Sequence, residues 1–418
     1  MILLIMMIIS VFLPLFLGAS IRNSRGVFIV YFFASVIVPY GFYIFTGSLN
    51  SFMASYIKEE NILYGGILLW ISYLLVIFSS LSFRKEKIKK IKKINLRRNR
   101  VLLLSLLAFL FYLLYILLSI YFAGSIEAAI HTAYARVRTN NSLANIRSVF
   151  LWGGVVFSTI SAYALFYKKI ENINAKVLIL INVVIGGLVT LMDGGRAVFL
   201  MYILSLFFGY IINLKLRKFL VYIIYFSALV GFASYIMIKA RYEAQEALIA
   251  AEGEIPISET LNGISYFDHF LISIEYAQNL GFTLGLNYLN ALLSFVPRDI
   301  YINKAIPLSA QVRSFLYGDD SGGVPPGLFG EAYIAGGIIT LLLISFLYGR
   351  ILNFSAVFCN RAVHLKCPTR LAIAGILIPM LGFTLVRGGI DIGVIRVGLP
   401  IIWCYIAVKI LTINIRSV

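Results

Sequence analysis

Long apolar runs, separated by short polar stretches, make up most of this chain. About 20 apolar residues form a helix long enough to cross the hydrocarbon core of a bilayer. The pattern predicts eleven such spans, or twelve if an apolar stretch of the one long polar region also crosses. They cover about residues 1–18, 27–47, 63–83, 101–121, 148–167, 177–192, 197–213, 219–238, 336–357, 371–386 and 393–411.

Composition supports a membrane protein. The chain has 418 residues, of which 61% are hydrophobic and 13% charged. A soluble core of any size would need more polar surface, so we expect an all-α polytopic protein with a single transmembrane domain over 1–418. The amino-terminal run lacks a charged n-region and is interpreted as a span, not a signal peptide. The scattered cysteines and histidines show no zinc spacing, and we expect no metal.

Charge orients the spans. The net charge is +18, and Arg84–Arg100 alone contains ten basic residues and one acid. Such a block between two spans is typical of a cytoplasmic loop on anionic lipid, and nucleic acid is the weaker interpretation. Alternation then places the carboxy terminus in the cytoplasm and sixteen of the eighteen acids outside.

This topology leaves eight arginines on the outer side, where the positive-inside rule expects few basic residues. Arginine offers a planar fork that holds phosphate bidentately, so a cluster of arginines there indicates an anionic ligand. The natural candidate is the diphosphate of a lipid carrier. The eight are Arg136, Arg138, Arg147, Arg196, Arg241, Arg298, Arg313 and Arg387.

One long outer segment, 239–336, separates the eighth and ninth spans. Its apolar stretches 264–279 and 284–296 are too short or too interrupted for confident spans. We expect them to lie in the interface or to pack as short helices. Proline and glycine punctuate the rest, as suits loops held over a site.

Two turns combine glycine with arginine. LMDGGRAVFL places Asp193, Gly194, Gly195 and Arg196 between two spans, where exposed amides and a helix amino terminus favour an anion. The alternative is a turn in which Asp193 caps the helix and Arg196 reaches the headgroups. In this interpretation the turn has no ligand.

LVRGGIDIGVIRVG joins the last two spans and contains Arg387, Asp391 and Arg396. A charge inside a span is costly unless paired, so Asp391 could partner Arg396, either as a structural ion pair or as part of a site. Arg241 leaves the eighth span at the predicted depth of Arg196 and Arg387. It could bind a diphosphate with them or simply anchor the span.

The stretch before the ninth span supplies further candidates. Arg298, Lys304 and Arg313 could bind phosphate. Glu331, followed by Tyr333, could be a carboxylate favoured by a helix dipole or a general base for a sugar hydroxyl. Asp268 and His269 form a rival base pair, although a histidine on such a helix is more often simply packed.

These residues give the chain a resemblance to the O-antigen polymerase (Wzy-type) family. The matching pieces are GGRAVFL, VPRDIYINKA and GLFGEAYIAGG, together with the large outer loop between late spans. Motif similarity covers about residues 190–200 and 265–340. The Arg-x10-Gly pattern of some members is off by one residue here, at Arg241–Gly253 and Arg313–Gly323.

The resemblance implies a GT-C-like glycosyltransferase of the bacterial inner membrane that requires no metal or other cofactor. It would transfer a glycan from undecaprenyl diphosphate to a lipid-linked repeat unit, in the company of membrane lipids, a flippase and a chain-length regulator. An O-antigen ligase is a close alternative. A lipid-linked oligosaccharide flippase is disfavoured, because the predicted spans hold almost no charge and show no inverted repeat.

Overall fold

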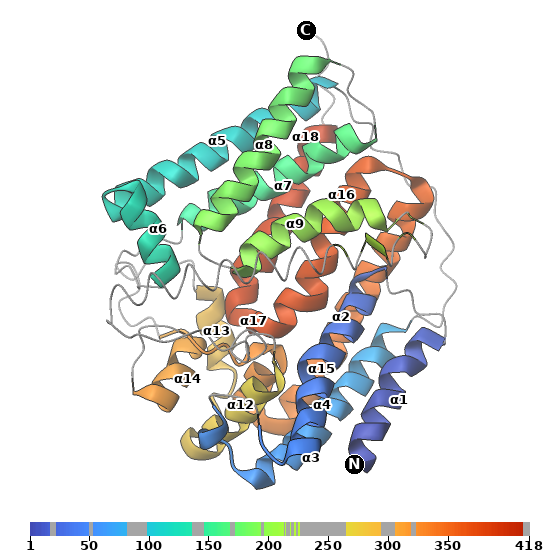
Figure 1. Ribbon diagram of the computed structural model, residues 1–418, viewed down its shortest axis with the longest axis vertical. Coiled ribbons are helices and arrows are strands. Elements are labelled where there is room, and N and C mark those ends of the chain that lie inside the picture. The colour runs from blue at the N-terminus through green and yellow to red at the C-terminus, as the bar shows by residue number, and fades with distance from the viewer. Residues whose placement is uncertain are drawn as a thin grey trace. The chain divides into compact units, whose positions relative to one another are not determined.

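The protein is an all-helical polytopic membrane protein over the part of the chain that the structure, a computed structural model, describes (Figure 1). The described residues are 1–16, 22–49, 53–81, 98–135, 146–167, 172–193, 196–212, 265–293, 306–318 and 323–412, with isolated positions between 214 and 225. Within them, eight helices are long and apolar enough to cross a membrane. These are Ser24–Thr46, Glu59–Ser80, Asn99–Ala123, Ile146–Phe166, Ile173–Met192, Gly327–Leu365, Pro368–Ile390 and Val394–Thr412.

Each of these eight overlaps a span predicted from hydropathy. Two further predicted spans correspond to shorter apolar helices, Ile2–Pro14 and Val198–Ile211. The span predicted over 219–238 falls largely outside the described residues. The total of eleven spans therefore stays a prediction.

The chain forms two compact units. Unit 1 comprises Met1–Lys85, Gly253–Ala356 and Met380–Ile395. Unit 2 comprises Glu86–Glu252, Val357–Pro379 and Arg396–Val418. Each unit is thus assembled from three separate stretches of sequence.

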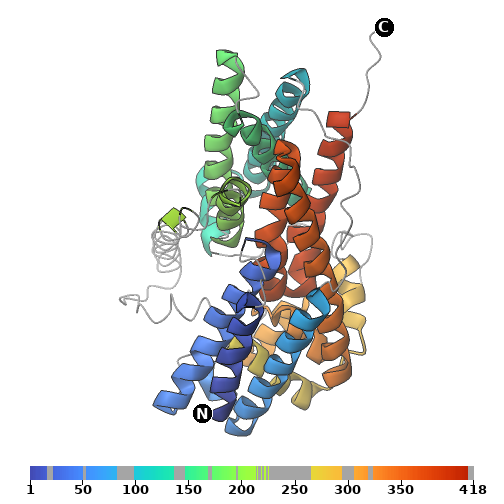
Figure 2. The ribbon, with the colours of Figure 1, turned by 90° about the vertical axis from the view of Figure 1, so that its right-hand side faces the viewer.

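Unit 1 begins with apolar helices that run side by side (Figure 2). A π-helical turn, Phe33–Ile37, joins α2 to α3 as one span-length helix. Phe28 and Phe32 of α2 stack on Tyr73 of α4, with ring centroids 5.9 and 4.5 Å apart. The helices are α1 (Ile2–Phe16), α2 (Ser24–Phe32), α3 (Val38–Thr46) and α4 (Glu59–Ser80).

Three short helices of unit 1 come from the long segment between predicted spans. They are α12 (Phe267–Leu280), α13 (Leu286–Leu292) and α14 (Leu308–Tyr317). Residues on every side of α12 are buried from Phe267 to Ala277, so it is a core helix and not an amphipathic surface helix. Its buried Glu275 accepts hydrogen bonds from the Lys58 N–H at 2.8 Å and from Asn61 Nδ2 at 2.7 Å, which ties α12 to the start of α4.

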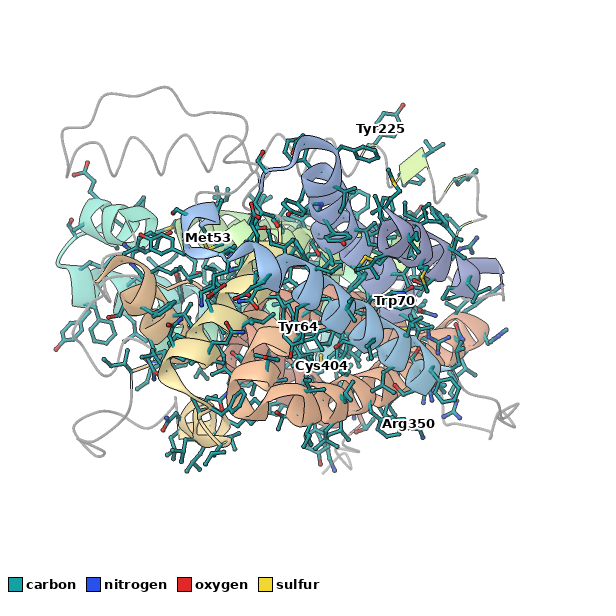
Figure 3. All side chains as sticks on the ribbon, turned by 90° about the horizontal axis from the view of Figure 1, so that it is seen from below. Met53, Tyr64, Trp70, Tyr225, Arg350 and Cys404 are labelled. Atoms are coloured by element: carbon teal, nitrogen blue, oxygen red, sulfur yellow. The ribbon has the colours of Figure 1, made fainter. Side chains whose placement is uncertain are left out.

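Helix α4 also contacts two other elements of unit 1 through the polar tips of aromatic residues. Tyr64 and Trp70 follow each other along it (Figure 3). The Tyr64 hydroxyl lies 3.3 Å from that of Tyr333, and Trp70 Nε1 donates to Ser10 Oγ at 3.2 Å. The polar tips of both side chains thus find partners inside unit 1.

The long helix α15 (Gly327–Leu365) is broken at Gly336 and Gly337, whose backbone angles are not helical. The break leaves the Ile334 carbonyl without its helical donor, and the Thr283 N–H donates to it at 2.9 Å. The span predicted over 336–357 corresponds to the longer half of α15, which follows the break. The final part of unit 1 is a π-helical turn, Met380–Thr384, followed by α17 (Leu385–Gly393).

Unit 2 is built around α7, which is buried at every residue from Leu151 to Ala164. The hydroxyl of Tyr163 on this helix donates to the Leu206 carbonyl of α9 at 2.9 Å. A last π-helical turn, Val394–Gly398, leads into α18. The helices are α5 (Arg98–Ala123), α6 (Ile126–Ala135), α7 (Ile146–Phe166), α8 (Ile173–Met192), α9 (Arg196–Ile211), α16 (Pro368–Pro379) and α18 (Leu399–Thr412).

Candidate functional site

Arg387 of α17 lies at the centre of a polar cluster in unit 1. Its Nη1 is buried and has no hydrogen-bond partner among the described residues, and the same is true of Tyr31 Oη and Ser35 Oγ. The Tyr31 hydroxyl is close to both Arg387 and Ser35, without a hydrogen bond of full geometry to either. Because buried polar atoms without partners are rare and costly, this group is suited to a ligand rich in oxygen atoms.

Two more hydroxyl groups belong to the same cluster. Ser265 Oγ and Tyr288 Oη are also buried without a partner in the described part of the chain. Ser265 precedes Tyr266, whose N–H donates to the Ser35 carbonyl at 2.8 Å. Burial, and after it the nearby charge of Glu331, raises the pKa of the Tyr288 hydroxyl. The unpartnered atoms therefore come from α2, the π-helical turn that follows it, α13, α17 and the residues just before α12.

Tyr266 holds the amino terminus of α15 against this cluster. Its hydroxyl accepts the N–H groups of Phe329 at 3.0 Å and Gly330 at 3.1 Å, and burial raises its pKa. Gly327, which has a φ of +71°, lets the start of α15 come close to the Tyr266 ring. A Cβ there would stand 2.2 Å from the Tyr266 ring and 2.6 Å from the Val386 carbonyl oxygen. The first turn of α15 is thereby seated against the residue that precedes Arg387.

His269 of α12 is neutral and has a defined tautomer. Its Nδ1 lies 3.0 Å from the Pro325 carbonyl oxygen, which can only accept, so Nδ1 carries the proton and Nε2 keeps its lone pair. Burial, followed by the nearby charge of Arg387, lowers the pKa of His269 to about 3. The cluster therefore combines a cation with an uncharged proton acceptor.

Glu331 of α15 is 1% exposed, and its carboxylate already has one partner. Oε2 accepts the Ile390 N–H at 2.6 Å. Ile390 follows Gly389, where α17 is interrupted by backbone angles of φ 69° and ψ −169°. A Cβ on Gly389 would stand 2.2 Å from Glu331 Oε1, so only glycine fits here. This contact, with the backbone of another segment, is a role that neither prediction for Glu331 described.

The remaining predicted residues of unit 1 make contacts of their own. Asp268, next to His269, is 4% exposed. Tyr333 pairs with the hydroxyl of Tyr64. Arg313 lies on α14, where its guanidinium stands 5.6 Å from the centroid of the Tyr317 ring, one turn along the same helix. This contact of Arg313 therefore lies within α14.

Unit 2 contains a separate charged cluster around Asp193, the residue that ends α8. Asp193 Oδ1 accepts a hydrogen bond from Tyr115 Oη at 2.9 Å. Burial raises the pKa of Asp193, whereas the nearby charges of Arg396 and Arg147 lower it. Arg396 is thus within electrostatic range of Asp193, while the side chain of Asp391, its partner expected from sequence, lies outside the described residues.

Several predicted ligands cannot be placed. Arg196 begins α9, but its side chain is outside the described residues. Gly194, Gly195, Arg241, Arg298 and Lys304 are also outside them. A common depth for the arginines therefore stays a prediction.

Sequence reasoning found Arg387, His269 and Glu331 but missed the hydroxyl groups around them. Tyr31 and Ser35 lie inside an apolar run, and the chain has 26 tyrosines. Nothing in the local sequence separates Tyr31 or Tyr288 from tyrosines that simply anchor a helix at the membrane interface. Only their lack of a hydrogen-bond partner distinguishes them.

Comparison of the whole chain with protein-family models, curated proteins and solved structures found no match.

Proposed function

We propose that the protein is an integral-membrane glycosyltransferase that polymerises lipid-linked oligosaccharide repeat units. The donor would be a glycan on undecaprenyl diphosphate, and the acceptor the next repeat unit on the same kind of carrier. The product would be an O-antigen or capsule-type polysaccharide. The observation that carries this proposal is the buried Arg387 guanidinium nitrogen, which has no hydrogen-bond partner in the described part of the chain, beside the neutral imidazole of His269.

The chemistry needs a cation where the leaving group departs. In the transfer, a hydroxyl oxygen of the acceptor bonds to the anomeric carbon of the donor sugar. The bond from that carbon to the diphosphate oxygen breaks, and the diphosphate leaves with the electron pair, still attached to its polyprenyl chain. A guanidinium neutralises the developing charge and holds two phosphate oxygens at once. Arg387 supplies this group, and Tyr31 and Ser35 supply hydroxyl donors beside it.

The hydroxyl proton of the acceptor must go to a base. Of the three proposed candidates, Glu331, Asp268 and His269, the contacts favour His269. Its Nε2 keeps a lone pair, whereas the Glu331 carboxylate already accepts the Ile390 N–H. The charge of Arg387 lowers the pKa of His269. A diphosphate bound to Arg387 would offset that charge and make His269 a stronger base.

The proposal also includes the position of the site and of the chain in the membrane. The site faces the outside of the bacterial cytoplasmic membrane, the carboxy terminus lies in the cytoplasm, and eleven to twelve spans form a GT-C-like fold. A flippase would deliver the repeat unit and a chain-length regulator would act on the product. Arg196, Arg241, Arg298, Lys304 and Arg313 remain proposed ligands of the diphosphate.

The test is deletion of the gene in its own host, followed by analysis of the surface glycan. Loss of long chains with retention of single-repeat caps is the expected result. Complete loss of capping would instead indicate a ligase, and precursor stalled on the inner leaflet would indicate a flippase. Complementation with the wild-type gene should restore the long chains, whereas an Arg387→Ala gene should not.

A further inference from the structure

The segment Leu280–Leu292, which contains α13, turns a series of apolar side chains outward. The exposed fractions run from 50% for Phe282 to 84% for Leu284. Leu284 has a φ of 51°, a left-handed conformation that leucine rarely adopts. The exposed side chains are Leu280, Phe282, Leu284, Leu286, Leu289 and Leu292.

The opposite side of the same segment is fixed to unit 1. Asn287 Nδ2 donates to the Glu331 carbonyl of α15 at 3.4 Å, and Asn287 is only 8% exposed. Ala291, one turn further along α13, is 3% exposed. These buried residues fix the orientation of α13, and this orientation turns its leucines away from the rest of unit 1.

The exposed apolar side chains of this segment lie next to α15, a helix long enough to span a membrane. The Phe282 ring packs at Gly337, where a Cβ would stand 3.1 Å from it, and Gly337 is the break after which the long half of α15 begins. Ile338 and Ile339, the first residues of that half, are 44% and 81% exposed. The leucines thus lie beside the first turn of a span.

Two further properties suit the segment to hydrocarbon. The residues 280–292 contain no charged side chain. Backbone N–H groups need partners away from water, and several of this segment find them within the protein. Thr283 N–H donates to the Ile334 carbonyl, Leu286 N–H to the Thr283 carbonyl, and Tyr288 N–H to the Gly285 carbonyl.

We propose that Leu280–Leu292 is seated in the bilayer, with its exposed leucines in contact with lipid acyl chains. A surface helix in water would instead present charged residues on the side away from the protein. The leaflet is the one that the charge distribution of the sequence assigns to the outside. Because α13 also carries Tyr288 of the polar cluster, one wall of that cluster would lie at bilayer depth. If the proposed function holds, a lipid-linked substrate could then reach the site sideways from the membrane.

The test measures the surroundings of single labelled positions in lipid vesicles. The free cysteines Cys359, Cys367 and Cys404 are first replaced by alanine. Leu286→Cys and, independently, Leu289→Cys are labelled with an environment-sensitive fluorophore and reconstituted in phosphatidylethanolamine–phosphatidylglycerol vesicles. Quenching by doxyl-labelled lipid is compared with quenching by aqueous iodide. Phe354→Cys, on the long half of α15 and 73% exposed, is the membrane control, and Tyr56→Cys, 41% exposed between two spans, is the aqueous control.

We expect the labels at 286 and 289 to be quenched by lipid as strongly as the label at 354 and to be protected from iodide at least several-fold relative to 56. Iodide quenching equal to that at 56, without lipid quenching, would overturn the proposal. So would energy transfer between labels on two copies of the chain, because a second copy would then cover the leucines. The measurement needs no glycan substrate, so its result is independent of the proposed function.

Discussion

The carboxylate of Glu331 accepts the backbone N–H of Ile390 at 2.6 Å, across 59 positions of sequence. The contact satisfies an amide that the break at Gly389 leaves without a helical acceptor. It also fixes the turn that begins two residues after Arg387. Glu331 thus holds the backbone that presents the guanidinium, and this role differs from proton transfer.

We expect Glu331→Gln to keep the fold and retain polymer, because the glutamine oxygen can still accept the Ile390 N–H. Glu331→Ala should lower stability by about 1–3 kcal/mol, since a buried donor then lacks an acceptor. Thermal unfolding in detergent and glycan chain length measure the two effects. A folded Glu331→Gln variant without polymer would return the base role to Glu331.

Arg387→Ala should reduce polymerisation by about 10- to 100-fold, since a hydrogen bond to a charged group contributes about 1.5–3 kcal/mol. Arg387→Lys should restore little, because an ammonium lacks the two-pronged geometry of the guanidinium. Glycan ladders at matched protein levels are the measurement. Arg350→Ala removes an exposed arginine of α15 (Figure 3) and serves as the control, with a normal ladder expected. Normal ladders in both Arg387 variants would refute the site.

His269→Asn separates the two nitrogens of the imidazole. The asparagine amide can replace the Nδ1 donor to Pro325 but offers nothing at the position of Nε2. We expect normal folding and a large loss of turnover in an assay with purified lipid-linked substrate. The pKa of His269 in the protein without substrate is about 3. The pH profile of kcat/KM, which reports the free enzyme, should therefore show no titration of His269 between pH 5 and 8. Normal turnover in His269→Asn would exclude His269 as the base.

The charged cluster of unit 2 should make stability depend on pH. The folded pKa of Asp193 is raised above its ordinary value of 3.8, so the folded state binds the proton more tightly than the unfolded state. Stability from this group is then greatest below that ordinary value and is lost as pH rises through the folded pKa. Asp193→Asn should remove this component.

Arg396→Ala should enlarge the same component, because Arg396 is the strongest of the charges that lower the Asp193 pKa. The measurement is the difference in Tm between pH 4 and pH 7 in detergent for wild type and both variants. An Arg396→Ala protein with the wild-type difference would show that the two charges do not interact.

Chelation should leave the activity unchanged. In the proposed reaction the leaving diphosphate is neutralised by guanidinium groups, so no divalent cation has to bridge its oxygens. Turnover of purified lipid-linked substrate with and without EDTA is the measurement. A loss that added magnesium restores would contradict the assignment of charge neutralisation to Arg387.

Hydropathy alone determined the helical class, the membrane and most span positions. Whether about 20 consecutive residues favour hydrocarbon is a local property, and the span predicted over 63–83 and the helix Glu59–Ser80 agree for that reason. The sequence also singled out Arg387, His269 and Glu331, because a charge or an imidazole at the end of an apolar run is conspicuous.

Only the tertiary structure decided what these residues meet. It buried α12 on all sides and brought Glu331 to Ile390. Among the described residues it left atoms of Tyr31, Ser35 and Arg387 without hydrogen-bond partners. It also placed the charges of Arg147 and Arg396 near Asp193, whereas the sequence had suggested only Asp391 as a possible partner of Arg396. Such contacts join residues far apart in the chain and depend on packing geometry, about which the order of apolar and polar residues carries no information.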